Sequence, residues 1–180
     1  MSELTVDQKK LLYLISLKGR IREDNGNIIW LKELALITLV FEGISRRIFK
    51  QYDYAPTLVS FRGVKLYANV SQEYMIDIDY LIKSQLVSKL KMNTKYYDNI
   101  TAYAITHNAN SVLSEIPESR RKSINEFMKC PKCDDIIKVL MKGRKAYIIC
   151  PECSYKMETG LFNIENIPYH SVAYFSGGGR

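Results

Sequence analysis

The sequence predicts an α+β protein in which a mostly helical amino-terminal part precedes a small β-hairpin module. Three observations lead to this fold class. Apolar residues recur at helical spacing in several segments before Pro117. Two short runs of alternating polarity, residues 87–92 and 100–105, predict a β-hairpin. All four cysteines lie between residues 130 and 153, in two C-x-x-C pairs, which sets the carboxy-terminal module apart.

The first two helices are marked by caps and by apolar stripes. Thr5 and Gln8 have the spacing of a capping box, and the apolar stripe that follows ends before Gly19. Residues 28–40 are apolar on most faces, which predicts a buried helix that Gly43 breaks.

A short helix and a pair of strands are expected next. Ser45 can cap a helix over residues 46–51, which Pro56 closes. Residues 58–67 are strand-like at both ends, and Arg62-Gly63 is a candidate turn between them.

The next helix begins after Ser71 and ends near Leu86. The two alternating runs follow it and are joined by a polar tip, as in a hairpin. A last helix, over about residues 108–116, ends before a proline. The charged residues 118–129 form a connector that is also predicted to be helical.

The strongest motif is C-P-K-C, followed after sixteen residues by C-P-E-C. Each C-x-x-C turn directs two sulfur atoms to one ion, and a hairpin of residues 136–140 and 147–149 would bring the two turns together. We predict one structural Zn²⁺ ion bound by Cys130, Cys133, Cys150 and Cys153. The alternatives are a redox pair, which needs only one such motif in a thioredoxin-like setting, and an iron–sulfur cluster.

Catalysis is not expected of this chain. Four cysteines fill a tetrahedral site and leave no position for a reactive water. The sequence lacks the glycine-rich phosphate loops, G-x-S-x-G and H-E-x-x-H. His107 and His170 are better explained as ordinary core or surface histidines. We therefore predict that the protein is not an enzyme.

Charge and hydropathy limit the classes of partner that the protein can have. The formal net charge is +7, which permits binding to nucleic acid without establishing it. No segment approaches the roughly 20 apolar residues of a membrane span, and the amino terminus lacks the layout of a secretory signal. We expect a cytoplasmic, nucleoid-associated protein with no membrane partner.

The order of the predicted elements is that of a winged-helix fold with extra helices. Residues 80–91, followed by 100–106, resemble the passage from helix to wing in winged-helix regulators. Residues 31–37 and 44–51 resemble the two helices of a helix-turn-helix, although a longer segment joins them. With the cysteine module, the chain resembles the archaeal-type winged-helix plus zinc-ribbon transcription factors, whose best-known layout is the alpha subunit of transcription factor E.

The charged connector, residues 118–129, indicates a domain boundary within it. The expected segments are a winged-helix domain, 1–118; a helical linker, 119–128; a zinc ribbon with a carboxy-terminal extension, 129–175; and a disordered tail, 176–180.

Two surfaces compete for contact with nucleic acid. The helix after Ser71 has the usual place before the wing, but it carries mostly acidic charge, which phosphate would repel. Residues 46–51 are basic, and arginine and glutamine can bind base edges. The predicted nucleic-acid-binding residues are Arg46, Arg47, Lys50, Gln51 and Arg62, with Lys89, Lys91 and Lys95 of the hairpin as backbone contacts. A further candidate patch, for nucleic acid or an acidic protein, is Lys138, Lys142, Arg144 and Lys145. The alternative is that these charges are only the solvated faces of their elements.

Together these features favour a DNA-binding transcriptional regulator, or an accessory factor of transcription initiation, that contacts duplex DNA. The alternative is a non-enzymatic protein-interaction adaptor on RNA polymerase or another nucleic-acid machine, with the acidic helix after Ser71 as its docking surface. A homodimer would match two DNA half-sites.

Overall fold

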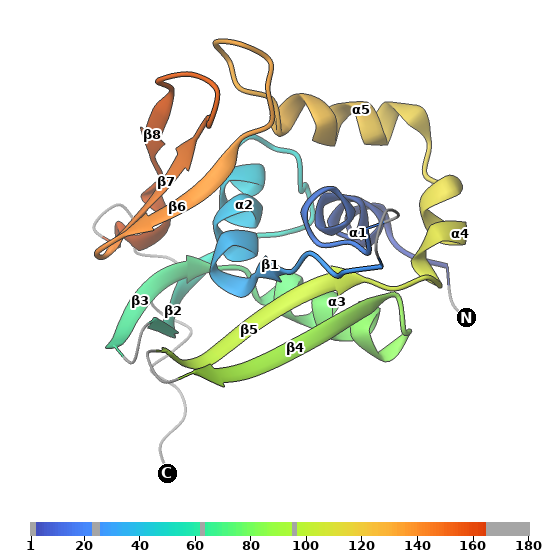
Figure 1. Ribbon diagram of the computed structural model, residues 1–180, viewed down its shortest axis with the longest axis horizontal. Helices are drawn as coiled ribbons and strands as arrows, with labels where there is room; N and C mark the ends of the chain where they lie inside the picture. Colours follow the sequence, from blue (N-terminus) through green and yellow to red (C-terminus); the bar gives the residue numbers. More distant parts are fainter. Residues whose placement is uncertain (1–2, 23–25, 62–63, 95–96, 165–180) are drawn as a thin grey trace.

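Two central helices organise the molecule. The computed structural model describes residues 3–22, 26–61, 64–94 and 97–164. Figure 1 shows α1 (Val6–Lys18) and α2 (Glu33–Ser45) at the centre, one sheet below them and a smaller sheet at the upper left. The mixed α+β fold class with small antiparallel sheets is therefore confirmed.

α1 begins and ends where its sequence predicts. The Thr5 side chain accepts a hydrogen bond from the backbone N–H of Gln8, and the Gln8 side chain accepts one from the Thr5 N–H. The apolar stripe of the helix is buried. Gly19 follows the last turn and lies against the backbone of Tyr103, so closely that a Cβ atom at Gly19 would overlap the Tyr103 carbonyl oxygen.

The main sheet joins strands from distant parts of the chain. Its order is β1 (Leu31–Lys32), β5 (Tyr97–Ile105) and β4 (Val87–Thr94), and both pairings are antiparallel. β4 and β5 form the hairpin that the alternating runs predict. Both α1 and α2 pack on β5, so one face of the sheet supports the two central helices.

The prediction of one helix over residues 28–40 is wrong at both ends. Residues 28–30 lie outside any helix, and α2 begins at Glu33 because the two residues before it pair with β5. Gly43 does not break the helix, which continues to Ser45. The Phe49 ring lies against Gly43, where a Cβ atom would approach it to 2.7 Å, so the glycine makes room for this ring.

The short helix predicted over residues 46–51 does not form. The chain turns back on α2, and Ile48 donates its backbone N–H to the Gly43 carbonyl at 2.8 Å. Arg47 has a φ of 59°, in the left-handed region, which a continuous right-handed helix does not tolerate. Pro56, which we expected to close this helix, lies in the following strand.

A second hairpin, β2 (Ala55–Phe61) and β3 (Val64–Val70), lies between α2 and α3 in the chain. It confirms the predicted pair of strands. The predicted turn, Arg62-Gly63, lies outside the described residues.

α3 (Gln72–Lys83) begins at its predicted cap, where the Ser71 hydroxyl accepts a hydrogen bond from the Tyr74 N–H at 3.1 Å. It ends before Leu86 because Gln85 adopts a φ of 58°. The chain then enters β4 directly, so α3 precedes the β4–β5 hairpin as expected.

The helices predicted near residues 108–116 and 118–129 are present as α4 (Ala109–Ser114) and α5 (Glu118–Phe127). α5 lies across α1 in Figure 1, and Asn125 accepts a hydrogen bond from the Tyr13 hydroxyl at 3.0 Å. Ile124 and Phe127 are buried. The helix that we expected to act as a linker therefore packs on the core.

The cysteine module forms the smaller sheet, with the order β6 (Lys138–Lys142), β7 (Lys145–Ile149) and β8 (Lys156–Glu158), followed by a 3₁₀ turn, η1 (Gly160–Phe162). Asn69 of β3 donates hydrogen bonds to the carbonyl groups of Gly160 and Asn163, both at 3.1 Å. Lys18 of α1 reaches the carbonyl of Ile137 at 2.8 Å.

These contacts join the module to the helical part through one buried core. The division of the chain into separate domains stays a prediction. The predicted tail, 176–180, and the extension from residue 165 onward lie outside the described residues. No described helix is both long enough and apolar enough to cross a membrane.

Candidate metal centre

The first C-x-x-C pair follows directly after α5. The Cys130 N–H donates to the Asp135 carbonyl at 2.7 Å, and the Cys130 carbonyl accepts from the Asp134 N–H at 3.0 Å. Asp134 has a φ of 59°, which turns the chain sharply after Cys133. The Lys132 N–H also points at the Cys130 sulfur, at 3.4 Å. This tight turn holds both sulfur atoms of the pair toward the same place.

The second pair follows β7. Here the Cys150 N–H donates to the Tyr155 carbonyl at 3.0 Å, which repeats the arrangement of the first turn. Lys138 pairs with Ile149 across β6 and β7, so both turns lie at the same end of this hairpin. The antiparallel pairing, and not the sequence spacing alone, therefore brings the two pairs together.

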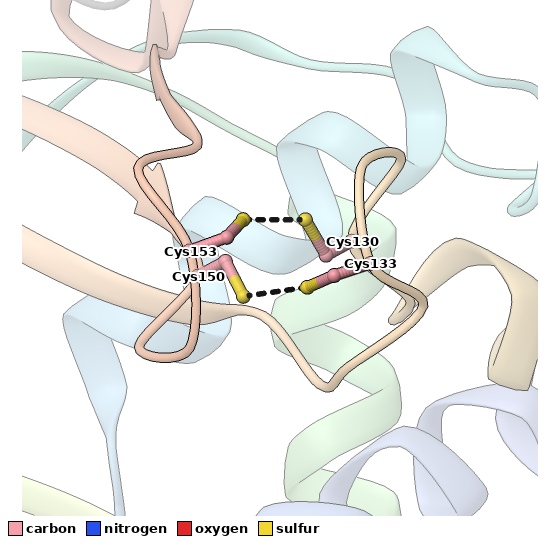
Figure 2. A group of neighbouring side chains, drawn as sticks. All are labelled: Cys130, Cys133, Cys150 and Cys153. Carbon is pink, nitrogen blue, oxygen red and sulfur yellow. Dashed lines mark hydrogen bonds between the residues drawn. The ribbon is translucent and has the colours of Figure 1, made fainter.

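The four sulfur atoms face one another across the gap between the turns (Figure 2). They all lie within 4.8 Å of one another. The sulfur atoms of Cys130 and Cys153 are 3.5 Å apart, and those of Cys133 and Cys150 are 3.4 Å apart. A disulfide has an S–S length of about 2.05 Å, so these are free thiols.

The distances fit a single tetrahedral ion. Zinc–sulfur bonds of about 2.3 Å place neighbouring sulfur atoms about 3.8 Å apart in a tetrahedron, within the range that the four cysteines span. Four thiol ligands leave no free position on such an ion. The four cysteines can therefore bind one metal ion, and zinc is compatible with them.

The protonation of the cluster also suits a cation. Burial opposes ionisation of Cys130, but the backbone N–H groups of Lys132 and Cys133 outweigh it and lower the pKa of this thiol to about 7. The N–H of Asp135 favours the Cys133 thiolate, yet the neighbouring Cys150 thiol and burial raise the pKa of Cys133 to about 12. A first thiolate thus forms readily while a second is opposed, and a bound dication would remove that opposition.

Within the described ranges, no other group of three or more histidine, cysteine, aspartate or glutamate side chains lies close enough together to hold a metal ion. His107 is exposed before α4. His170 lies outside the described residues.

A family model described as "Uncharacterized protein MJ1567 family" matches residues 7–159. The chain belongs to this family. The match runs from α1 through β8 and includes all four cysteines, so the helical part and the cysteine module form one family unit. No curated protein and no solved structure matches the chain. The resemblance to winged-helix plus zinc-ribbon transcription factors stays a prediction.

The segment 46–51 of this family member is basic, and its first arginine is 41% exposed but also contacts other elements of the molecule. The Arg46 guanidinium lies 5.6 Å from the centre of the Phe127 ring and 4.0 Å from the Met157 sulfur. It also pairs with Glu42 at 3.9 Å. Arg46 therefore joins the end of α2 to α5 and β8, which is a structural use of this side chain.

The remaining predicted residues of this segment are exposed, as Arg46 is: Arg47, Lys50 and Gln51. Their backbone is anchored to α1, because the Gln51 N–H donates to buried Asp7 at 2.8 Å and the Lys10 ammonium donates to the Ile48 carbonyl. The segment is thus held firmly, but as a turn and not as a recognition helix.

The predicted hairpin contacts lie on another part of the molecule. Lys89 and Lys91 are exposed on β4, and the Lys89 ammonium lies 5.8 Å from the centre of the Tyr103 ring. α2 starts beside this sheet and leads away from it, and its 13 residues span about 20 Å. Arg46 follows the end of α2 that lies farther from this sheet. Arg62 and Lys95 lie outside the described residues.

The surface on which basic residues do gather includes the further patch that the sequence predicts at Lys138, Lys142, Arg144 and Lys145, and it extends beyond that patch. Alternate residues of β6, β7 and β8 point away from the core, and four of these eight are lysines. We refer to this side of the small sheet as the outer ribbon face. It contains Lys138, Leu140, Lys142, Lys145, Tyr147, Ile149, Lys156 and Glu158. The alternation in K-V-L-M-K and K-A-Y-I-I could have revealed it.

Proposed function

We propose that this protein is a zinc-stabilised, non-enzymatic factor that binds nucleic acid and acts with the transcription machinery. The metal would be a structural Zn²⁺, because four thiolates complete its coordination and leave no site for a reacting water. The ion would hold the two C-x-x-C turns together and so fix the small sheet, a zinc ribbon, on the core.

The arrangement of the main sheet supports a winged-helix interpretation of the amino-terminal part. The elements follow the order α1, β1, α2, α3, β4 and β5, with β1 beside the β4–β5 hairpin. The β2–β3 hairpin would then be an insertion before α3. α3 would have the place of the recognition helix.

The observation that carries the proposed binding to nucleic acid is the charge of the outer ribbon face. It holds four lysines against one glutamate, and Arg144 lies in the adjoining turn. Phosphate binds such a surface by releasing counterions. By contrast, the outward side of α3 carries Glu73 and Asp79, so phosphate contact at the usual winged-helix position would be unfavourable.

Binding to duplex DNA, measured by fluorescence anisotropy over a range of salt concentrations, tests this proposal. The zinc-loaded protein should bind more tightly as salt falls. The salt slope is the steepness with which the logarithm of affinity falls against the logarithm of salt concentration. The double variant Lys138→Gln and Lys142→Gln should reduce this slope by about 2, since each lost phosphate contact removes about 0.9. The matched control is Lys83→Gln with Lys122→Gln, two exposed lysines on helices elsewhere. Affinity for this duplex that does not rise as salt falls would end the proposed binding to duplex DNA.

A second candidate function is a protein-interaction adaptor, and the surface of α3 favours it. Met75 is 41% exposed and Ile76 is 69% exposed, beside Glu73 and Asp79. An apolar and acidic helix surface suits a basic protein partner such as a subunit of RNA polymerase. Titration of purified polymerase with the wild-type protein and with Ile76→Lys tests this. Equal affinity of the two proteins would exclude α3 as the docking surface.

A further inference from the structure

The outer ribbon face has an aromatic residue at its centre. Tyr147 lies on β7, the middle strand, and its cross-strand neighbours are Leu140 on β6 and Glu158 on β8. The opposite side of the sheet buries Ala146 and Ile148 in the core. The alternation of the strand therefore directs the Tyr147 ring outward.

The Tyr147 ring already holds a cation. The Lys156 ammonium lies 4.1 Å from the ring centre, so a face of this ring is within reach of mobile, solvent-exposed groups. A flat nucleobase can take the place of this ammonium on the ring. The displaced lysine would then remain close enough to pair with the phosphate of the same nucleotide.

Two of the four lysines around Tyr147 have neither an ion pair nor a ring contact among the described residues. Glu158 pairs with Lys145 at 2.9 Å. Within the part of the chain that the structure describes, Lys138 and Lys142 have no acidic partner. Strand geometry places the Cα atoms of Lys138 and Lys142 about 13 Å apart along β6. It also places β8 about 10 Å from β6, across the sheet. An aromatic ring framed by free lysines on this scale fits a few nucleotides.

A hollow adjoins this face and extends it. It has a volume of about 440 Å³ and shares Lys145 and Glu158 with the outer ribbon face. Its lining also includes Arg144 and Phe162, another cation and another ring. A chain of nucleotides crossing Tyr147 could continue into this hollow.

We propose that the outer ribbon face binds single-stranded nucleic acid, with a base stacked on Tyr147 and phosphates paired with Lys138, Lys142 and Lys156. The inference rests on the proposed nucleic-acid function and names its ligand. Duplexes hide the faces of their bases, whereas an unpaired strand offers them to an aromatic ring. A ring amid lysines is therefore complementary to a single strand and gains little from a duplex.

The test uses the full-length, zinc-loaded protein with fluorescein-labelled oligothymidine, oligouridine and a duplex of the same length. The single strands should bind more tightly than the duplex. Tyr147→Leu should weaken binding of the single strands by about five- to 150-fold, the range for loss of one stacked base, while Tyr147→Phe should keep it. Duplex binding should change little in either variant. Comparison of oligothymidine with oligouridine shows whether the site prefers DNA or RNA.

Tyr67→Leu is the matched control, because Tyr67 is 54% exposed on another hairpin and should not affect binding. Zinc content and thermal unfolding must match the wild type, so that a misfolded ribbon is not mistaken for a lost contact. Duplex binding with no effect of Tyr147→Leu on single strands overturns this inference and leaves the proposed function standing. Failure of the wild type to bind any of the three ligands at low salt overturns both.

Discussion

The sulfur atoms of Cys130 and Cys153 lie 3.5 Å apart although these cysteines are 23 positions apart in the chain. The contact depends on the pairing of β6 with β7, which places the two tight turns at the same end of one hairpin. So small a sheet buries little apolar surface by itself. A metal ion at the cysteines would therefore act as the main cross-link of this module.

Removal of one ligand should release the metal. We expect the wild type, purified under reducing conditions, to contain about one zinc per chain, and Cys153→Ser to contain much less. Because the module packs on the shared core, the variant should also unfold at a lower temperature. Ser154→Ala, at the neighbouring exposed position, is the control and should keep its zinc. Metal analysis by mass spectrometry gives the answer, and a wild type without metal would refute the site.

Gly19 should not tolerate a side chain. A Cβ atom there would overlap the carbonyl oxygen of Tyr103, and backbone cannot move aside as a flexible side chain can. We expect Gly19→Ala to lower the free energy of unfolding by about 1–3 kcal/mol. At Gly160 a Cβ atom would meet only the Phe41 ring, at 3.4 Å, so Gly160→Ala should be nearly neutral. Urea unfolding of the two variants measures the difference; equal losses would contradict this account.

Local sequence signals predicted the features whose causes are local. The Thr5 capping box, the Ser71 cap and the C-x-x-C turns each depend on residues within a few positions, and each forms as expected. The start of α2 could not be found in this way. Leu31 pairs with Tyr103, far along the chain, and this strand pairing overrides the helical pattern of residues 28–32.

The contacts of Arg46 could not be predicted from the sequence either. As a pattern, residues 46–51 indicate a basic helix that faces solvent. In the structure, contacts with Phe127 and Met157, both distant in sequence, place the guanidinium between elements. The outer ribbon face was predicted only in part. The sequence indicated its basic residues around the β6–β7 turn, but that Tyr147 and Lys156 share their side could not be predicted, because the side of the sheet that faces the core is set by tertiary packing.

Buried Asp7 should be needed to hold the segment 46–51 on α1. Its carboxylate pairs with buried Lys10 at 3.1 Å and accepts the Gln51 N–H at 2.8 Å. Asp7→Asn would leave the Lys10 ammonium buried without a counter-charge, which should cost about 3 kcal/mol or more of unfolding free energy. Glu3→Gln, which breaks an exposed pair with Lys9, should change stability only slightly. Chemical unfolding that ranks the two variants the other way would exclude this role of Asp7.

Glu42 should make stability depend on pH in an unusual direction. Burial raises its pKa, and the neighbouring Arg46 offsets this only in part. A raised pKa means that the folded state binds the proton more tightly than the unfolded state. The charged carboxylate therefore lowers the free energy of unfolding at neutral pH, and this loss becomes smaller as pH falls toward the raised pKa. Glu42→Gln should therefore be more stable than the wild type at pH 7. The difference should shrink toward pH 5. Thermal unfolding across this range tests the prediction, and a constant difference would contradict it.

Substitutions of Arg46 and Lys142 should have different effects: the first should lower stability, and the second should weaken DNA binding. Arg46→Gln removes a guanidinium that contacts the Phe127 ring, so we expect a loss of about 1 kcal/mol in unfolding free energy and an unchanged salt slope for DNA binding. Lys142→Gln removes an exposed charge with no internal partner among the described residues, so stability should stay the same while the salt slope falls by about 0.9. If the salt slope falls with Arg46→Gln and not with Lys142→Gln, the nucleic-acid surface lies at the end of α2 as the sequence predicts. The opposite result places it on the ribbon, since only a charge that meets phosphate contributes to the slope.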